Sequence, residues 1–211
     1  DGSGDIETYF FLDGSGNSGN NPRTVFPDNS SIVVGTGNDL FIKHTGTNSE
    51  IKNYTGDLII SNNANDKDII FQCDDHSGGT STYFFLDGST TSELTTTFPD
   101  NSMAAFGTGN DLRLWHDGST SYINNYTGTF KFYQHVDDGD MIFYCDDGSG
   151  GTTPYITLDG GVGNTYAYKD IRFVDDVLAI FGTSGDMSIK HDGSNMTMIN
   201  STGSMAFYQS V

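Results

Sequence analysis

The feature that most constrains the fold of this chain is an internal repeat. Residues 26–30 (FPDNS) return unchanged at 98–102, and residues 35–40 (GTGNDL) return at 107–112, in each case 72 positions later. A looser copy of the second phrase follows at 182–187 (GTSGDM). Self-similarity at a fixed period indicates a repeat architecture. We divide the 211 residues into unit 1 (1–74), unit 2 (75–146) and a truncated unit 3 (147–211).

Both ends of the chain fall inside the repeat pattern. Residues 1–4 (DGSG) align with 147–150, and residues 207–209 (FYQ) align with 132–134 (FYQ). We therefore expect the chain to be a segment of a longer array.

Within each unit the apolar residues recur with a period of two. Residues 40–44 (LFIKH), 112–116 (LRLWH) and 187–191 (MSIKH) each place Leu or Met, then Ile or Leu, then His on one face, while the other face varies. This alternation is typical of strands with one buried face. The same alternation occurs at Leu58 and Ile60, at Phe130 and Phe132, at Met205 and Phe207, at Ile69, Phe71 and Cys73, and at Met141, Phe143 and Cys145.

Turn residues separate these segments, and they act through backbone geometry. Asp117-Gly118 and Asp192-Gly193 favour hairpins because glycine adopts positive φ readily. No window longer than about ten residues keeps a helical period without a glycine. The sequence predicts an all-β chain with six or seven short antiparallel strands per unit. We expect one loop per unit, after Leu12, Leu86 or Leu158, to vary in length.

The charge of the chain excludes several classes of partner and function. With 28 acidic against 9 basic side chains, the net charge of −19 repels nucleic acid and anionic membrane surfaces. No run approaches the ~20 apolar residues that a membrane span requires. The chain has no nucleophile elbow, phosphate-binding loop or metalloprotease motif, so we expect no enzymatic activity.

Composition favours association between copies of the chain. Only 35% of the residues are hydrophobic and 27 are glycine. One unit would bury little apolar surface against a large loss of backbone entropy. Several copies around a common axis would cover the apolar faces and protect the sheet edges. We expect an elongated fibre, as a parallel homotrimer.

The string at 107–123 (GTGNDLRLWHDGSTSYI), with 192–195 (DGSN), resembles a repeat of virion structural and tail-fibre-like proteins of marine phages, cyanophages included. The likeness covers the core of all three units and departs from the pattern at Thr45 and at 196–198 (MTM). It implies a trimeric, β-rich fibre in a virion or outside the cell. Other virion or fibre proteins, and a host-surface glycan or protein, would be its partners.

Two alternative functions remain open. One is a calcium-dependent adhesin or glycan-binding repeat module that uses the variable loops. The other is a β-propeller or solenoid scaffold, which fits poorly because common propeller blades have about 40 to 50 residues.

The candidate ligand-binding residues each have a structural alternative. His44, His116 and His191 recur on the apolar face, where they would hold a metal ion or an anion on a trimer axis, or else bond to a neighbouring strand or turn. Calcium is the possible cofactor. Its candidate ligands are Asp66, Asp68, Asp138 and Asp140, which otherwise serve as solvated turn residues. We expect Asp66 and Asp68 to share one strand face.

The cysteines and the tryptophan complete the candidates. Cys73 and Cys145 occupy equivalent positions one unit apart, too distant in a stack to form a disulfide, so we expect buried free thiols. Trp115 stands where the other copies have lysine. It would stack on a sugar ring or be an incidental exposed aromatic residue.

Overall fold

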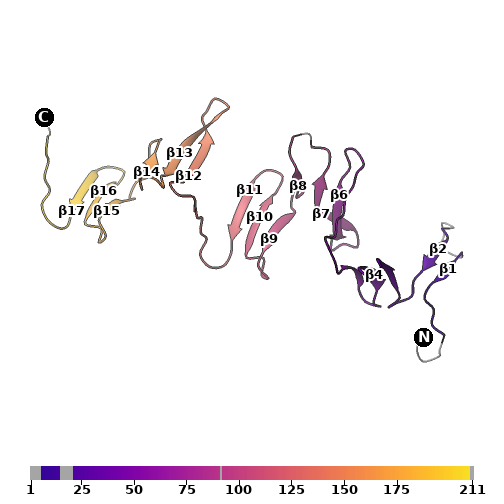
Figure 1. The fold of residues 1–211 in the computed structure, drawn as a ribbon. Helices are drawn as coiled ribbons and strands as arrows, with labels where there is room; N and C mark the ends of the chain where they lie inside the picture. The colour runs from indigo at the N-terminus through magenta and orange to yellow at the C-terminus, as the bar shows by residue number, and fades with distance from the viewer. Residues whose placement is uncertain (1–5, 15–20, 91, 210–211) are drawn as a thin grey trace. The chain divides into compact units, whose positions relative to one another are not determined.

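The computed structural model describes residues 6–14, 21–90 and 92–209 (Figure 1). These residues form short strands and no helix, as the sequence predicts. The described residues therefore contain no helix long and apolar enough to cross a membrane. The strands are β1 (Phe11–Asp13), β2 (Arg23–Val25), β3 (Ser31–Val34), β4 (Leu40–His44), β5 (Ser49–Asn53), β6 (Ile69–Asp74), β7 (Thr80–Asp87), β8 (Thr95–Thr97), β9 (Met103–Phe106), β10 (Leu112–His116), β11 (Ser121–Asn125), β12 (Met141–Asp146), β13 (Thr152–Leu158), β14 (Thr165–Ala167), β15 (Ala179–Phe181), β16 (Met187–His191) and β17 (Met196–Asn200).

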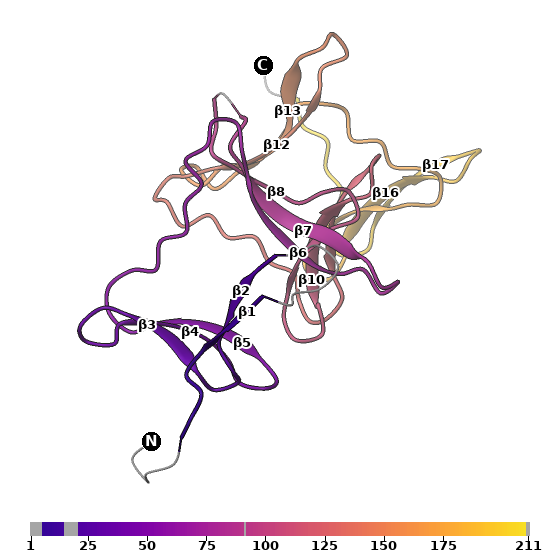
Figure 2. The same ribbon diagram turned by 90° about the vertical axis from the view of Figure 1, so that its right-hand side faces the viewer.

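The strands pair only with near neighbours in sequence, always antiparallel. Three sheets, β3-β4-β5, β9-β10-β11 and β15-β16-β17, have a central strand that ends in histidine, and we call them the histidine sheets. Two further sheets, β6-β7-β8 and β12-β13-β14, contain a bulge and are called the bulged sheets. Strands β1 and β2 form a hairpin. In both ribbon views, β6 and β7 lie side by side (Figures 1 and 2).

Cross-strand register places apolar residues opposite one another in every histidine sheet. In the first of these sheets Ile42 pairs with Ile32 on one side and Ile51 on the other. The corresponding rows are Ala104, Leu114 and Ile123 in the second sheet, and Ala179, Ile189 and Met198 in the third. Because side chains alternate along a strand, the histidine that follows two residues later lies on the same face. The predicted strand face is thus confirmed.

In the bulged sheets, one extra tyrosine interrupts the ladder. Phe71 pairs with Phe84 while Gln72 pairs with Thr82, so Tyr83 has no cross-strand partner. Tyr155 occupies the same place in β13. Each tyrosine hydroxyl donates a 3.3 Å hydrogen bond to a backbone carbonyl at the end of the neighbouring strand, that of Asp74 or Asp146. A bulge re-aims a side chain in this way and bends the strand.

The predicted turns have the backbone geometry that their glycines favour. Gly118 and Gly193 have φ values of 96° and 91° in the hairpins after the histidines. In the turn between β9 and β10, a Cβ on Gly107 would lie 2.4 Å from Asp111 Oδ2, so no larger residue fits there without displacing the carboxylate. The next turn depends on Asn125, whose side-chain amide donates to the carbonyls of Thr127 and Gly128. Asn53 and Asn200 do the same in the other histidine sheets.

Two sequence predictions about chain layout are wrong. The alternating segments at Leu58 and Ile60, Phe130 and Phe132, and Met205 and Phe207 lie outside the strands, because no other described segment of the chain supplies a ladder partner. The extra length of unit 3 does not lie in the loop after Leu158. It lies instead in the connection between β14 and β15, residues 168–178.

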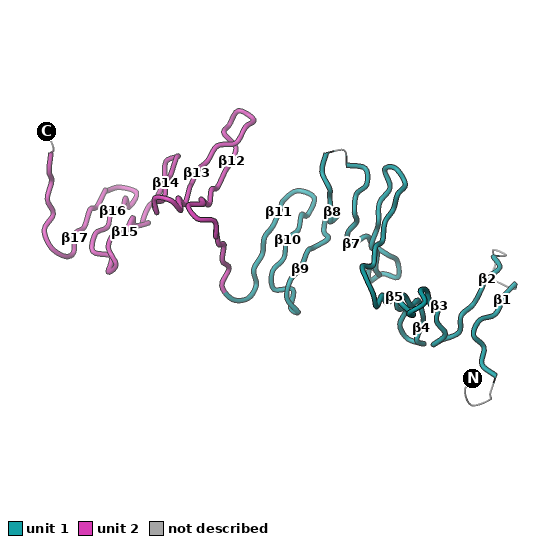
Figure 3. The backbone as a smooth tube through the Cα atoms, viewed as in Figure 1, with its two compact units in different colours: residues 1–128 teal, residues 129–211 magenta. Residues whose placement is uncertain are grey.

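The chain divides into two compact units, Asp1–Gly128 and Thr129–Val211 (Figure 3). The boundaries between sequence repeats, at 74/75 and 146/147, fall within the β6–β7 and β12–β13 hairpins. A sequence period therefore begins and ends inside a sheet.

Neither unit has a hydrophobic core of its own. No hydrophobic side chain is buried among the described residues, and Thr157 is the one residue reported as buried there, at 4% exposure. Strands in substantial contact always belong to the same sheet. The accessible surface is 17220 Å², whereas a compact monomer of 22.8 kDa has about 9,600 Å². The sheets are formed, but their faces remain uncovered by this chain.

Candidate functional site

The most distinctive surface is the face of the histidine sheets that carries the histidines, which we call the apolar face. Ile32 and Ile42 are 40% and 43% exposed there, and Ile51 is 59% exposed. Together with Phe26 and His44 they line a shallow groove over the first sheet. Leu114, Ile123 and Met198 are similarly exposed in the other two sheets. Contiguous apolar surface of this kind marks an interaction site.

The opposite face of each histidine sheet carries polar and aromatic side chains that contact one another. In the first sheet, Glu50 lies 2.8 Å from the Lys52 ammonium and 3.7 Å from that of Lys43. The hydrogen bond from Lys52 lowers the pKa of Glu50. Phe41 packs edge-on against Tyr54. This face has its own partners and is suited to water.

Trp115 belongs to that opposite face. Its indole ring stacks on Tyr122 with a centroid separation of 4.8 Å, and Nε1 donates a 3.0 Å hydrogen bond to Asn124 Oδ1. The Arg113 guanidinium lies 4.5 Å above the Tyr126 ring beside it. The interpretation of Trp115 as an incidental exposed aromatic residue is wrong, since the side chain is half-buried by neighbours that the sequence did not reveal.

Two of the three histidines bond to the adjacent strand. His44 Nδ1 lies 3.1 Å from Ser49 Oγ, and His116 Nδ1 lies 3.1 Å from Ser121 Oγ. In both sheets the serine is the cross-strand partner of the histidine. This geometry is the structural alternative that the sequence left open.

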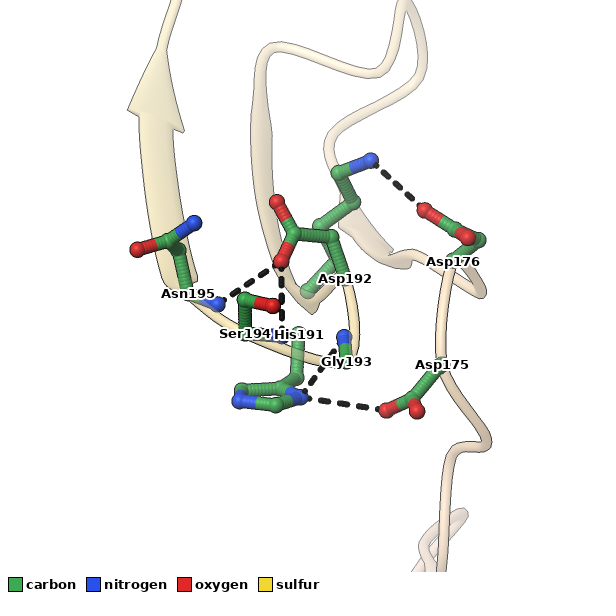
Figure 4. A network of polar contacts seen from close by, with 8 residues as sticks. Asp175, Asp176, His191, Asp192, Gly193, Ser194 and Asn195 are labelled. Atoms are coloured by element: carbon green, nitrogen blue, oxygen red, sulfur yellow. Dashed lines mark hydrogen bonds and ion pairs between the residues drawn. The ribbon is translucent and has the colours of Figure 1, made fainter.

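The third histidine differs because Met196 replaces the serine. His191 Nδ1 lies 3.1 Å from both Asp175 Oδ1 and the Gly193 backbone nitrogen (Figure 4). An unprotonated Nδ1 accepts from the Gly193 N–H, whereas a protonated Nδ1 donates to the Asp175 carboxylate. The carboxylate of Asp192 accepts from the backbone of Ser194 and Asn195 in the same turn.

The histidines of one chain lie in three separate sheets. Nowhere in residues 6–14, 21–90 and 92–209 do three or more His, Cys, Asp or Glu side chains gather as a metal site. A shared ion between the histidines of one chain therefore finds no support in the structure.

The calcium candidates take part in loop geometry. Asp68 Oδ1 accepts a 3.0 Å hydrogen bond from the Gly88 N–H, and Asp140 Oδ1 accepts one of 3.0 Å from Gly160. Asp66 and Asp138 occupy turns with φ of 54° and 56°. The expectation that Asp66 and Asp68 share a strand face is wrong, because both precede β6.

Cys73 and Cys145 are free and exposed, so the expected burial is wrong for a single chain. Each lies in the outer strand of a bulged sheet, on the side of the strand shared with Phe71 or Phe143. Nothing in this chain packs over that side.

Sequence reasoning missed the carboxylates that organise the long hairpins. Asp75 Oδ1 accepts from the Ser77 N–H at 2.8 Å, from the Ser77 hydroxyl at 2.7 Å and from the Gly79 N–H at 3.0 Å. Asp147 has the same partners in Ser149 and Gly151. The signal was the spacing Asp-x-Ser-x-Gly, because Asp side chains readily accept from backbone N–H groups two residues later.

These contacts predict an acid-sensitive hairpin tip. The hydroxyl of Ser77, and then its backbone N–H, lower the pKa of Asp75, and Ser149 lowers that of Asp147. A lowered pKa in the folded state gives stabilisation that is complete above the unfolded value of about 3.9 and is lost as the pH falls through the folded pKa. Amide exchange at Ser77 and Gly79 is expected to accelerate below about pH 4, with a midpoint under 3.9.

The control for the acid experiment is Asp75→Asn, which keeps an acceptor oxygen but does not titrate. Exchange at Ser77 should then show no acid transition beyond that of the intrinsic rate. A transition that persists in this variant would assign the effect to another group.

No family model, curated protein or solved structure matches the chain. The candidate function therefore rests on the surfaces described above.

Proposed function

We propose that the chain is a structural segment of an elongated fibre, built by self-association of identical copies as a parallel homotrimer. Tandem units of about 72 residues would follow one another along the fibre. The resemblance of residues 107–123 to marine phage repeats favours a virion tail-fibre-like component, or an extracellular fibre, that supports attachment to a host surface.

The observation that carries the proposal is the uncovered apolar face of each histidine sheet. Ile32, Ile42 and Ile51 form a continuous row across three strands and remain 40% to 59% exposed. The chain as a whole exposes about 7,600 Å² more than a compact monomer of its mass. Stable obligate interfaces bury about 2,000 to 5,000 Å² in total, so the excess is ample for a multi-chain assembly.

A second copy of the chain is the natural cover for these faces. The same arrangement of apolar residues recurs in all three histidine sheets, so parallel copies in register present like faces at each level. A common axis satisfies this requirement with one closed, repeated interface.

Light scattering after size exclusion tests self-association directly. We expect a mass of about three times 22.8 kDa, together with a thermal midpoint that rises with protein concentration. A monomer with a cooperative, concentration-independent transition would contradict the proposal.

A further inference from the structure

Three short segments alternate like strands but have no backbone partner. They are residues 58–61 (LIIS), 130–133 (FKFY) and 205–208 (MAFY), each directly after the last turn of a histidine sheet. None of these residues takes part in a backbone hydrogen bond within the described part of the chain. We call them the unpaired segments.

The side-chain contacts of the second segment show an extended backbone. The rings of Phe130 and Phe132 meet edge-on at 4.6 Å, and the Lys131 ammonium lies 6.0 Å from the ring centre of Tyr133. Contacts between residues two apart arise when successive side chains point to opposite sides, as in a strand. The segment therefore has strand-like side-chain alternation before any ladder has formed.

Burial of such a segment requires a hydrogen-bonding partner. Covering Phe130, Phe132 or their counterparts in an assembly would also remove water from the adjacent N–H and C=O groups, and an unsatisfied buried polar group costs about 1 to 3 kcal/mol. A strand from another chain satisfies those groups and covers the side chains together.

We propose that the unpaired segments become strands by pairing with the backbone of a second copy of this chain. This inference rests on the proposed self-association and specifies how the copies join. Three observations favour a second copy. The segments recur once per unit, at equivalent places in the sequence, so every copy supplies several at matching levels. They contain no Asp or Glu, although the chain has 28, so identical copies approach here without carboxylate repulsion. They also follow β5, β11 and β17, which are themselves outer strands with one unpaired edge.

A proline scan tests the pairing without disturbing the single chain. Proline removes the backbone N–H and holds the preceding residue extended. The N–H groups at Leu58, Ile59 and Ile60 make no hydrogen bond within the chain, so proline there removes no intramolecular hydrogen bond. We expect at least a tenfold weaker self-association at alternate positions, measured by the concentration dependence of the mass from light scattering. Loss at consecutive positions indicates partner strands on both sides and equally supports the pairing.

The matched control is Leu94→Pro, in the loop before β8. Leu94 is fully exposed, and its N–H makes no hydrogen bond in the described part of the chain. This variant should assemble like the parent protein. If every proline variant in 58–60 and 130–132 also assembles normally, the pairing is refuted while self-association stands. A monomeric parent protein would instead refute both.

Hydrogen exchange gives a second readout that does not require a variant. In the assembled protein, amides of 59–61 and 131–133 should exchange at least tenfold more slowly than those of 92–94, after correction for intrinsic rates. Equal rates in these peptides would overturn the inference even if the proline variants fail to assemble for other reasons.

Discussion

Replacing Ile32 by Asp is expected to dissociate the assembled protein, whereas replacing Val33 by Asp leaves it assembled. The two residues are neighbours in β3, both are β-branched, and they are 40% and 41% exposed in the single chain. They differ in the face of the sheet on which they lie. Ile32 pairs with Ile42 on the apolar face, and Val33 pairs with Phe41 on the opposite face.

The size of the expected effect follows from the burial that assembly would bring. Ile32 loses a contribution of about 1.5 to 3 kcal/mol when its side chain no longer enters an apolar interface, and the new carboxylate adds a desolvation cost of several kcal/mol. The dissociation constant should rise by at least about 100-fold, since each 1.4 kcal/mol is a factor of ten. Mass measured by light scattering across a dilution series provides the comparison.

A second pair of neighbours repeats the comparison in the third histidine sheet. Met198 lies on the apolar face of β17 and Ile199 on the opposite face, at 40% and 46% exposure. Met198→Asp should weaken assembly while Ile199→Asp should not. Equal dissociation by both members of either pair would show that the opposite face is also covered, and the assignment of the interface to one face would fail.

The sequence predicted those features of the fold that depend on local chemistry. Period-two patterning placed Leu40, Ile42 and His44 on one strand face, and the structure confirms it. Glycine at Gly118 and Gly193 predicted turns that have positive φ. Alternation and turn geometry are properties of a few consecutive residues, so a single sequence reveals them.

The incorrect predictions concern partners that local pattern does not specify. Leu58 and Ile60 alternate like a strand, but a strand also needs a second backbone, and this chain provides none in its described part. The exposure of Cys73 has the same origin, because strand pattern identifies a face without identifying what covers it. Asp66 was misplaced because its positive φ puts it in a turn rather than in β6.

The candidate site was predictable in position and less so in chemistry. Recurrence identified His44, His116 and His191 as equivalent, but their hydrogen bonds depend on the residue across the ladder. Serine at that position in two sheets accounts for the contacts of the first two histidines, and methionine in the third leaves His191 to Asp175 and Gly193. Register had to be known before that partner could be named.

Three equivalent glycines allow a test of how successive units are joined along the chain. A Cβ on Gly88 would lie 2.4 Å from the Lys67 carbonyl oxygen, and one on Gly160 would lie 2.3 Å from the Gly139 carbonyl oxygen. Gly14 holds the same place in the first unit, where no described atom lies within 4 Å. None of the three has the positive φ that strains other residues, so alanine acts through crowding alone.

Gly88→Ala and Gly160→Ala should therefore destabilise the protein, and Gly14→Ala should not. The added methyl group must displace a backbone carbonyl and with it the hydrogen bond from the Gly88 N–H to Asp68, at a cost of about 1 to 3 kcal/mol. For a unit of this size the thermal midpoint falls by roughly 4 to 8 °C per kcal/mol, while the Gly14 variant should stay within about 0.5 kcal/mol of the parent. Thermal unfolding followed by circular dichroism measures all three. If the Gly88 variant melts with the Gly14 variant, the close approach of residue 88 to the loop before β6 is not part of the folded protein.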